Sequence, residues 1–369
     1  MNLRTAFAAT VLLTTCFCGL ISFPSAQTPS SVMTLLSATG AMTIKYHLFQ
    51  PTGYNRSVKY PLVLTFHGIG EDGEANIGAI DYHGIAATWI DTNFQKSHPC
   101  FVVSPHNPSG TWTGFDYTIA NSTGTFVQPS AISTRLSTVM GILDSICKEF
   151  NIDTNRIYIT GLSIGGFATW DLITRFPKKF AAAIPMSGAV DTSKASRIAS
   201  LPIWNIHGQV DGSVTALSSR LIMKKLDSLD GNKGVVYPEC KDTACTTMPN
   251  TRLDSLINAG ATHLYSEQQN GGHVLWLGYY SNSRIREWLF KQIKPAPAAS
   301  RVRPAIKSSS GENRMTGAVL LSADAQRLKK QNPLIRMYDV HGRLFGSTQN
   351  RRTSATGVVI VKSHQNASK

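Results

Sequence analysis

Acidic residues are scarce in this chain. Its 369 residues include 22 Asp and Glu against 36 Lys and Arg, which gives a formal net charge of +14. The excess is uneven, because residues 27–294 carry a net charge of +3 whereas residues 295–369 carry +10. A basic tail is more typical of a solvated appendage than of a nucleic-acid reader. The tail does not show the aromatic and basic interleaving of a known nucleic-acid module, so no nucleic-acid partner is expected.

Cysteine is also sparse, with six in the whole chain. None of the spacings resembles a zinc site, so no metal is expected. Cys240 and Cys245 bracket a short polar loop, a spacing compatible with a local disulfide in an oxidising compartment. Cys100 and Cys147 are predicted to be buried thiols.

A long apolar run occurs only at the N-terminus. The stretch Ala6–Phe23 follows Arg4 and is followed by the small residues Ser25 and Ala26. This pattern predicts a signal peptide over residues 1–26, with an uncleaved membrane anchor as the alternative. We therefore expect a secreted or cell-surface protein without a membrane span once the signal is removed.

The remaining chain is predicted to have three parts: a large domain at 27–294, a linker rich in Pro, Ala, Ser and Lys at 295–316, and a basic β module at 317–369. Within the first part, strands and helices are predicted to alternate. Such alternation requires mostly parallel strands joined by crossovers, hence an α/β fold with an open sheet and helices on both faces. Ligands bind such sheets at the carboxyl ends of the strands.

Apolar patterning places the individual elements. Strands are predicted at 42–49, 61–67, 156–160, 181–186 and 202–207, and helices at 131–150, 167–176 and 215–229.

The segment Gly161-Leu162-Ser163-Ile164-Gly165 lies between a predicted strand and a predicted helix. This is the context of the nucleophile elbow of α/β hydrolases. The glycines are needed because side chains beside the serine would collide with the neighbouring strand or helix. Ser163 is therefore the predicted nucleophile, and a glycine-rich turn with a structural serine is the alternative.

A serine hydroxyl needs a histidine to take its proton, and the histidine needs a carboxylate to orient it. His273 follows two glycines in a polar turn before a terminal helix, and it is the predicted base; His263 is a weaker candidate. Asp211 follows the predicted strand at 202–207, where an orienting carboxylate should stand. Asp191, after the preceding strand, is its main rival.

An oxyanion that develops during catalysis needs backbone donors. The turn His67-Gly68-Ile69-Gly70 leaves a buried strand, and the amides of Ile69 and Ile164 are predicted to supply these donors. A phosphate-binding loop is the alternative, but the turn lacks the lysine and hydroxyl of a P-loop. No cofactor is expected.

The loop from 105 to 127 is long and aromatic, and includes Phe115 and Tyr117. Loops of this length usually line a site or move. Trp112 and Trp276 are predicted to form a substrate wall for a sugar or an aromatic acyl group, with simple packing as the alternative.

These segments resemble secreted carboxylesterases related to feruloyl and acetylxylan esterases, polyhydroxybutyrate depolymerases and chains described as predicted peptidases. The resemblance spans about residues 40–293 and rests on Tyr60–Glu71, Asn155–Gly166, Ile206–Asp211 and Gly272-His273. It implies a triad in the order serine, acid, histidine, an acyl-enzyme intermediate and no metal.

The resemblance does not fix the substrate. An acyl ester of a plant polysaccharide, feruloyl or acetyl, is predicted because a secreted enzyme with aromatic loop residues suits it. Three alternatives stay open: a serine peptidase of the same fold, a short-chain polyester or lipid esterase, and a carbohydrate-binding module that has lost catalysis.

The tail segments Met337–Arg343 and Gly357–Lys362 resemble the C-terminal sorting domain of type IX secretion cargo. That resemblance would make the secretion machinery a partner. The tail departs from the pattern because it lacks the aromatic residue after Gly357 and is rich in arginine. The alternative is a basic β appendage that anchors the protein or binds carbohydrate.

Overall fold

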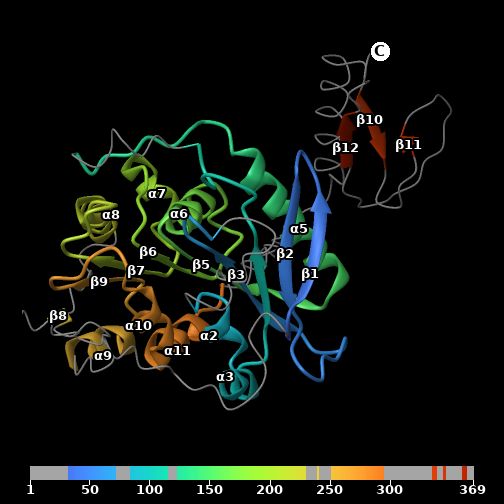
Figure 1. Ribbon diagram of the computed structural model, residues 1–369. Helices are drawn as coiled ribbons and strands as arrows, with labels where there is room; N and C mark the ends of the chain where they lie inside the picture. The colour runs from blue at the N-terminus through green and yellow to red at the C-terminus, as the bar shows by residue number, and fades with distance from the viewer. Residues whose placement is uncertain are drawn as a thin grey trace, which may run out of the picture. The chain divides into compact units, whose positions relative to one another are not determined.

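Figure 1 presents a computed structural model of the chain. It describes residues 32–71, 84–114, 123–229, 239–240, 251–294, 335–338, 344–345 and 360–363. The predicted signal peptide, the predicted linker, Phe115, Tyr117 and the side chains of Cys240 and Cys245 lie outside the described residues. The chain divides into two compact units, Met1–Ala299 and Ser300–Lys369.

The first unit is built on one large sheet. Among the described residues it has nine strands, in the spatial order β1-β2-β4-β3-β5-β6-β7-β9-β8. The strands are β1 Thr34–Thr39, β2 Thr43–Phe49, β3 Tyr60–Phe66, β4 Phe101–Pro105, β5 Ile152–Leu162, β6 Ala182–Met186, β7 Ile203–Gly208, β8 Glu239–Cys240 and β9 His263–Gln268.

Strand direction is mostly parallel. β1 pairs antiparallel with β2, and β2 pairs antiparallel with β4, whereas all pairs from β4 to β8 are parallel. The predicted α/β class with a mostly parallel sheet is confirmed. The hairpin partner β1 was not predicted, because it is an edge strand whose apolar residues do not alternate regularly with polar ones, and none of its six residues is buried.

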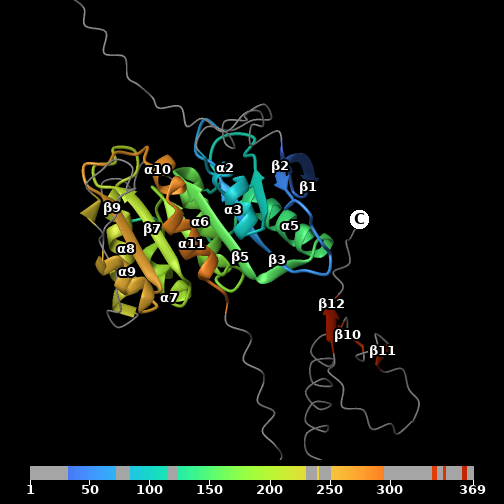
Figure 2. The same cartoon turned by 90° about the horizontal axis from the view of Figure 1, so that it is seen from below.

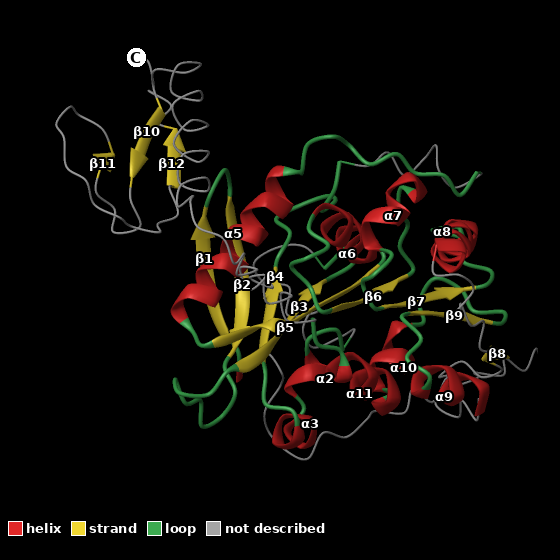
Figure 3. Cartoon of the chain, turned by 180° about the vertical axis from the view of Figure 1, so that it is seen from behind, coloured by secondary structure: helices red, strands yellow, loops and turns green. Residues whose placement is uncertain are grey.

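Helices cover both faces of the sheet, as Figures 2 and 3 show. In Figure 3, α5, α6, α7 and α8 lie on one side, and α2, α3, α9, α10 and α11 lie on the other. Their bounds are α2 Ala87–Ile90, α3 Thr92–Ser97, α5 Thr134–Glu149, α6 Ile164–Arg175, α7 Ala195–Ile198, α8 Ala216–Leu229, α9 Thr251–Asn258, α10 Trp276–Ser281 and α11 Ser283–Lys291. Within the part of the chain that the structure describes, no helix is long and apolar enough to cross a membrane.

The apolar runs of the sequence form the central strands of the sheet. Leu62, Val63 and Leu64 of β3 are all fully buried, since successive side chains face the helix layers on opposite sides of the sheet. Two hydrophobic clusters result, one beneath α5, α6 and α8 and one beneath α2, α10 and α11. These two clusters hold the central strands between the helix layers, and the candidate site lies at the carboxyl ends of those strands.

Two helices begin at residues other than those predicted. α5 begins at Thr134 rather than 131, because the side chain of Ser133 accepts a hydrogen bond from the amide of Leu136 and caps the helix. α6 begins at Ile164 rather than 167, because Ser163 itself is the N-cap residue. The helix therefore starts directly at the predicted nucleophile.

The second unit contains a small antiparallel sheet of its own. Its described strands are β10 Ile335–Tyr338, β11 Leu344–Phe345 and β12 Ile360–Ser363, in the order β11-β10-β12. β10 overlaps the segment Met337–Arg343 and β12 overlaps the segment Gly357–Lys362, the two tail segments singled out in the sequence.

Candidate active site

Ser163 sits in a strained turn between β5 and α6. Its φ is 53° and its ψ is −122°, a conformation that residues other than glycine rarely adopt. The turn is held because the amide of Ser163 donates to the carbonyl of Met186 at 3.0 Å and the carbonyl of Ser163 accepts from Phe167 at 3.0 Å. The hydroxyl is thereby presented at the carboxyl end of β5.

The glycines of this turn permit a very close backbone approach. A Cβ atom at Gly161 would lie 2.2 Å from the carbonyl oxygen of Gly165, and one at Gly165 would lie 2.0 Å from the carbonyl oxygen of Phe66 on β3. Real Cβ atoms do not approach backbone so closely. The steric reason predicted for both glycines therefore holds in the structure.

The structure brings the three predicted triad residues together from separate loops. His273 Nε2 lies 2.9 Å from the hydroxyl oxygen of Ser163, and His273 Nδ1 lies 2.7 Å from Oδ2 of Asp211. Asp211 follows β7, and His273 lies in the turn after β9. The two loops are tied by backbone hydrogen bonds from Gln209 to Gln268 and from Val210 to Gly271, both at 2.9 Å.

The carboxylate of Asp211 is fully buried and well hydrogen-bonded. Oδ1 accepts from the amides of Ser213 at 2.8 Å and Val214 at 2.9 Å, while Oδ2 faces two histidines, His273 and His207. Burial alone would raise the pKa of Asp211, but the hydrogen bonds of His207, His273 and Val214 outweigh it and lower the pKa below its usual range. The carboxylate is therefore ionised at neutral pH.

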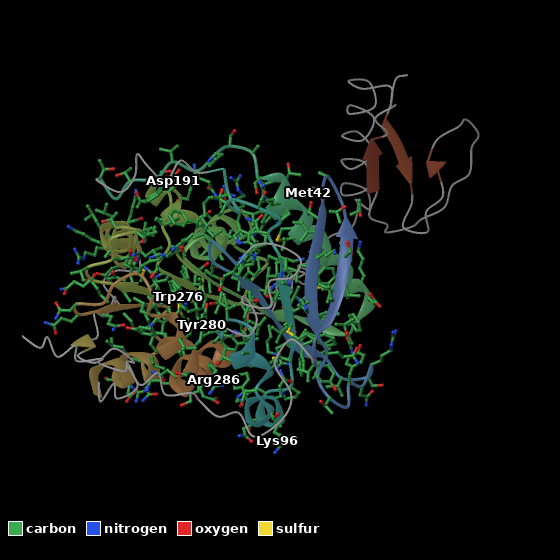
Figure 4. All side chains as sticks on the ribbon, viewed as in Figure 1. Met42, Lys96, Asp191, Trp276, Tyr280 and Arg286 are labelled. Atoms are coloured by element: carbon green, nitrogen blue, oxygen red, sulfur yellow. The ribbon has the colours of Figure 1, made fainter. Side chains whose placement is uncertain are left out.

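The two rival candidates lie elsewhere. Asp191 holds a neighbouring loop, because its carboxylate accepts from the amides of Gln128 at 3.1 Å and Ser193 at 2.9 Å. Figure 4 labels it well away from Trp276, the neighbour of His273. His263 is the first residue of β9, so it lies at the amino end of that strand rather than the carboxyl end.

The predicted oxyanion loop lies against the nucleophile. A Cβ atom at Gly68 would be 3.6 Å from Cβ of Ser163. The amide of Gly68 donates to the buried carboxylate of Glu71 at 2.6 Å, so this donor is already used. Ile69 comes next and is 66% exposed, and Ile164 is the first residue of α6, where helix N–H groups lack partners within the helix.

Hydrogen bonds of the His67 ring fix the shape of this loop. Its Nε2 accepts a hydrogen bond from the amide of Asn107 at 2.9 Å, so Nδ1 carries the proton and donates to the carbonyl of Gly68 at 2.7 Å. The indole of Trp112 donates to the carbonyl of His67 at 3.1 Å. These contacts agree with the expectation that His67 and Gly68 shape the turn.

The predicted tryptophan wall needs correction. Trp112 is 0% exposed and packs edge-on against Phe66 and His67, so its indole supports the oxyanion loop and offers no face to a substrate. Trp276 is 4% exposed and meets the ring of His273 edge-on at a centroid distance of 5.3 Å. Both side chains are therefore packed inside the protein, which is the alternative stated for them in the sequence analysis.

Two further residues at the site escaped prediction. Glu71 caps the loop amide, and His207 contacts the carboxylate of Asp211. Both stand inside the segments that carry the family resemblance, at fixed spacing from Gly68 and Asp211. Their positions near the carboxyl ends of buried strands, His207 inside β7 and Glu71 in the turn after β3, were the available signal, but only the fold reveals that these two side chains turn inward.

The sheet and the elbow together define an α/β hydrolase. The chain belongs to the phospholipase/carboxylesterase family, which matches residues 55–251, more than half of its length. This membership places it in a class of carboxylic ester hydrolases.

Curated relatives match the chain in part. A bifunctional acetylxylan esterase/xylanase of Neocallimastix patriciarum is 30% identical over 167 residues, 45% of this chain and 21% of that protein. A poly(3-hydroxyalkanoate) depolymerase C of Paucimonas lemoignei is 27% identical over 159 residues, 42% of this chain and 34% of that protein. The chain thus spans a third or less of the length of these relatives.

Among solved structures, a thermostable esterase is similar with a TM-score of 0.58 and 32% sequence identity. The match covers 72% of this chain and 64% of the esterase.

Three histidines gather beneath the oxyanion loop. His47 Nδ1 lies 2.5 Å from His106 Nε2, and the rings of His67 and His106 are 6.3 Å apart. Burial, followed by the proximity of His47 and His67, lowers the pKa of His106 to about 3. His106 is therefore neutral in the folded protein. Within the described residues, no group of three or more His, Cys, Asp or Glu side chains is arranged to hold a metal ion.

Replacement of Gly165 by alanine is expected to prevent folding, because the new Cβ would overlap the carbonyl of Phe66 and force β3 and α6 apart. Gly141→Ala is the matched control, since a Cβ there meets nothing within 4 Å on the exposed face of α5. The control should gain roughly 0.5–1 kcal/mol in the free energy of unfolding. Soluble yield and urea unfolding measure both effects. A Gly165→Ala protein as stable as the wild type would contradict the steric argument.

His106→Gln is expected to weaken the acid sensitivity of the fold. The pKa of His106 is about 3 when folded against 6.5 for an ordinary histidine, so only the unfolded chain gains the proton between these values, and stability falls as pH drops from 6.5 toward 3. Between pH 7 and pH 5 this group should cost the wild type about 2 kcal/mol. Urea unfolding at both pH values should show a correspondingly smaller loss in the variant. An equal loss in the two proteins would refute the assignment.

Proposed function

We propose that the chain is a serine carboxylic ester hydrolase with Ser163 as nucleophile, His273 as general base and Asp211 as the orienting acid. The observation that carries this proposal is the continuous hydrogen-bonded chain from the Ser163 hydroxyl through both ring nitrogens of His273 to the Asp211 carboxylate, with separations of 2.9 and 2.7 Å. These separations suit direct proton transfer between hydroxyl and imidazole.

Acylation follows from this geometry. As the Ser163 oxygen bonds to the ester carbonyl carbon, its proton passes to Nε2 of His273. The tetrahedral intermediate collapses with cleavage of the ester C–O bond, and His273 gives the proton to the departing alcohol. Deacylation repeats the steps with water, whose proton passes to His273 and then to the Ser163 oxygen as the carboxylic acid leaves.

Asp211 has an electrostatic role in both steps. It accepts from Nδ1 of His273, which leaves Nε2 without a proton and directed at Ser163. Because its carboxylate stays ionised, it stabilises the imidazolium that forms in each transition state.

In the tetrahedral intermediate, the former carbonyl oxygen of the ester carries a negative charge. Hydrogen-bond donors near Ser163 must stabilise this charge. We assign this role to the amides of Ile69 and Ile164. The use of the Gly68 amide by Glu71 supports Ile69 as the donor from the first loop. The position of Ile164 at the start of α6 adds the positive end of the helix dipole.

For the substrate, we propose acyl esters of plant polysaccharides, feruloyl or acetyl. Ile69 and Val274 directly follow Gly68 and His273 in the chain, and both side chains are well exposed, at 66% and 72%. We propose that they form an apolar rim beside Ser163, which would suit an aromatic acyl group. The acetylxylan esterase relative supports a polysaccharide ester, while the depolymerase relative keeps polyesters as the alternative. Secretion and a sorting role of the tail stay predictions.

Ser163→Ala is expected to lower kcat by about 10⁴-fold or more on p-nitrophenyl acetate, p-nitrophenyl butyrate and methyl ferulate, because no other group supplies the nucleophile. Alanine fits the same backbone space, so thermal unfolding should be nearly unchanged. A fluorophosphonate probe should label the wild type and not the variant.

Other outcomes would redirect the proposal. Turnover that survives in Ser163→Ala would exclude the serine mechanism. Faster cleavage of aminoacyl amides than of esters would favour a peptidase. A folded wild type that is neither labelled nor active would favour a binding protein.

Val274→Asn is expected to lower kcat/KM for methyl ferulate by roughly fivefold, because the apolar contact with the aromatic ring is worth about 1 kcal/mol. The effect on p-nitrophenyl acetate should stay under about twofold, since the acetyl group is too small to reach the rim. Val58→Asn is the control, as Val58 is 47% exposed in the β2–β3 connection. Equal losses on both substrates in Val274→Asn would contradict the rim.

A further inference from the structure

A second histidine contacts the buried carboxylate of Asp211. His207 lies near the end of β7 and its side chain is 0% exposed. Its Nε2 lies 2.9 Å from the carbonyl oxygen of Val214 and 3.2 Å from Oδ2 of Asp211, and its Nδ1 lies 2.7 Å from the hydroxyl of Ser219 on α8. Both ring nitrogens of His207 therefore have hydrogen-bonding partners.

The partners fix which nitrogen carries the proton. Both neighbours of Nε2, a carbonyl and a carboxylate, can only accept, so Nε2 must be protonated and shared between them. In the neutral ring Nδ1 is then an acceptor, and the Ser219 hydroxyl donates to it. Ser219 thus selects the tautomer of His207 that donates toward Asp211.

Oδ2 of Asp211 consequently lies between two serine–histidine pairs, Ser163–His273 on the open side and Ser219–His207 on the buried side. Only the first pair can react with a substrate, because Ser219 is 1% exposed. With the amides of Ser213 and Val214 on Oδ1, the buried pair completes the set of donors that a carboxylate can accept.

The other charged groups near His207 are already paired. Glu267 on β9 stands opposite His207 in the strand register, but its oxygens accept from Arg220 at 2.8 and 2.6 Å and from the hydroxyl of Tyr265 at 2.7 Å. Asp211 is thus the carboxylate with which His207 shares its proton.

We propose that His207, held by Ser219, is a positioning residue that keeps the Asp211 carboxylate fixed in rotation and aimed at Nδ1 of His273. This inference rests on the proposed function, since it concerns the acid of that triad. His207 contacts neither the substrate nor Ser163 and acts only through Asp211. Its hydrogen bond contributes to lowering the pKa of Asp211, which is consistent with a donor that favours the charged form.

The test is a double-mutant cycle on kcat with p-nitrophenyl acetate, using His207→Leu, Asp211→Asn and the double variant. Leucine removes the donor at similar volume, so the carboxylate can rotate, and kcat should fall roughly 10- to 100-fold with KM within about twofold. In the Asp211→Asn background the same change should alter kcat by less than about twofold, because the carboxylate whose orientation His207 is proposed to fix has been replaced.

His207→Gln is the conservative variant, since its amide can place an N–H near the position of Nε2. It should recover kcat to within roughly threefold of the wild type. A loss as large as that of His207→Leu would show that a donor at this position is not what matters, and would overturn the proposal.

A matched serine pair tests the same point if His207→Leu does not fold. Ser219→Ala removes the group that selects the tautomer and should lower kcat about two- to fivefold, again only when Asp211 is present. Ser218→Ala removes a neighbouring hydroxyl of α8 that is equally buried and does not contact His207, and it should not change kcat. Equal effects of the two serine variants would refute the role of Ser219.

Two failures can be told apart. If wild-type turnover does not depend on Ser163, the proposed function fails. If turnover depends on Ser163 and Asp211 but the His207→Leu effect is the same with Asp211 and with Asn at that position, only the role of His207 fails.

Discussion

The site depends on the close contact of three backbones at the nucleophile elbow. α6 approaches β3 so closely that the structure has room only for a hydrogen atom at Gly165. This contact, together with the hydrogen bond from Ser163 to Met186 of β6, holds Ser163 at a φ of 53°. The strain is tolerated because two strands and a helix over-determine the turn. Any change that separates these elements would release the strain and withdraw the hydroxyl from His273.

The features of the fold and of the site that could be predicted are those that leave a local pattern in the sequence. The buried apolar run of β3 and the glycines around Ser163 indicated the sheet and the elbow before the fold was known, and chain order then limited the choice of acid and base. Features that depend on contacts between residues distant in the sequence could not be predicted. Trp112 lies in a loop that the sequence predicts to be exposed. Its ring is nevertheless buried, because it packs against Phe66 and His67. His207 lies within a predicted strand, and the sequence does not show that its ring meets Asp211 four residues later or that Ser219 of α8 bonds its other nitrogen.

The layer beneath the site is polar. Asp211 is ionised, whereas His106 stays neutral. A buried charge is costly unless it is hydrogen-bonded. Two amides and two imidazoles surround the Asp211 carboxylate and offset this cost. The charge of Asp211 can therefore persist next to His273, where the proposed mechanism requires it.

The proposed apolar rim and the proposed catalytic groups share the same short turns. Ile69 lies in the turn beside Ser163 and its own amide is a proposed oxyanion donor, while Val274 directly follows His273, the proposed base. A large substituent that moves either turn would therefore also move one of these groups. In the proposed mechanism, binding of the acyl group and stabilisation of the transition state are thus coupled through the backbone of the two turns. Substitutions that alter the rim without displacing its backbone are therefore the ones that can separate acyl preference from turnover.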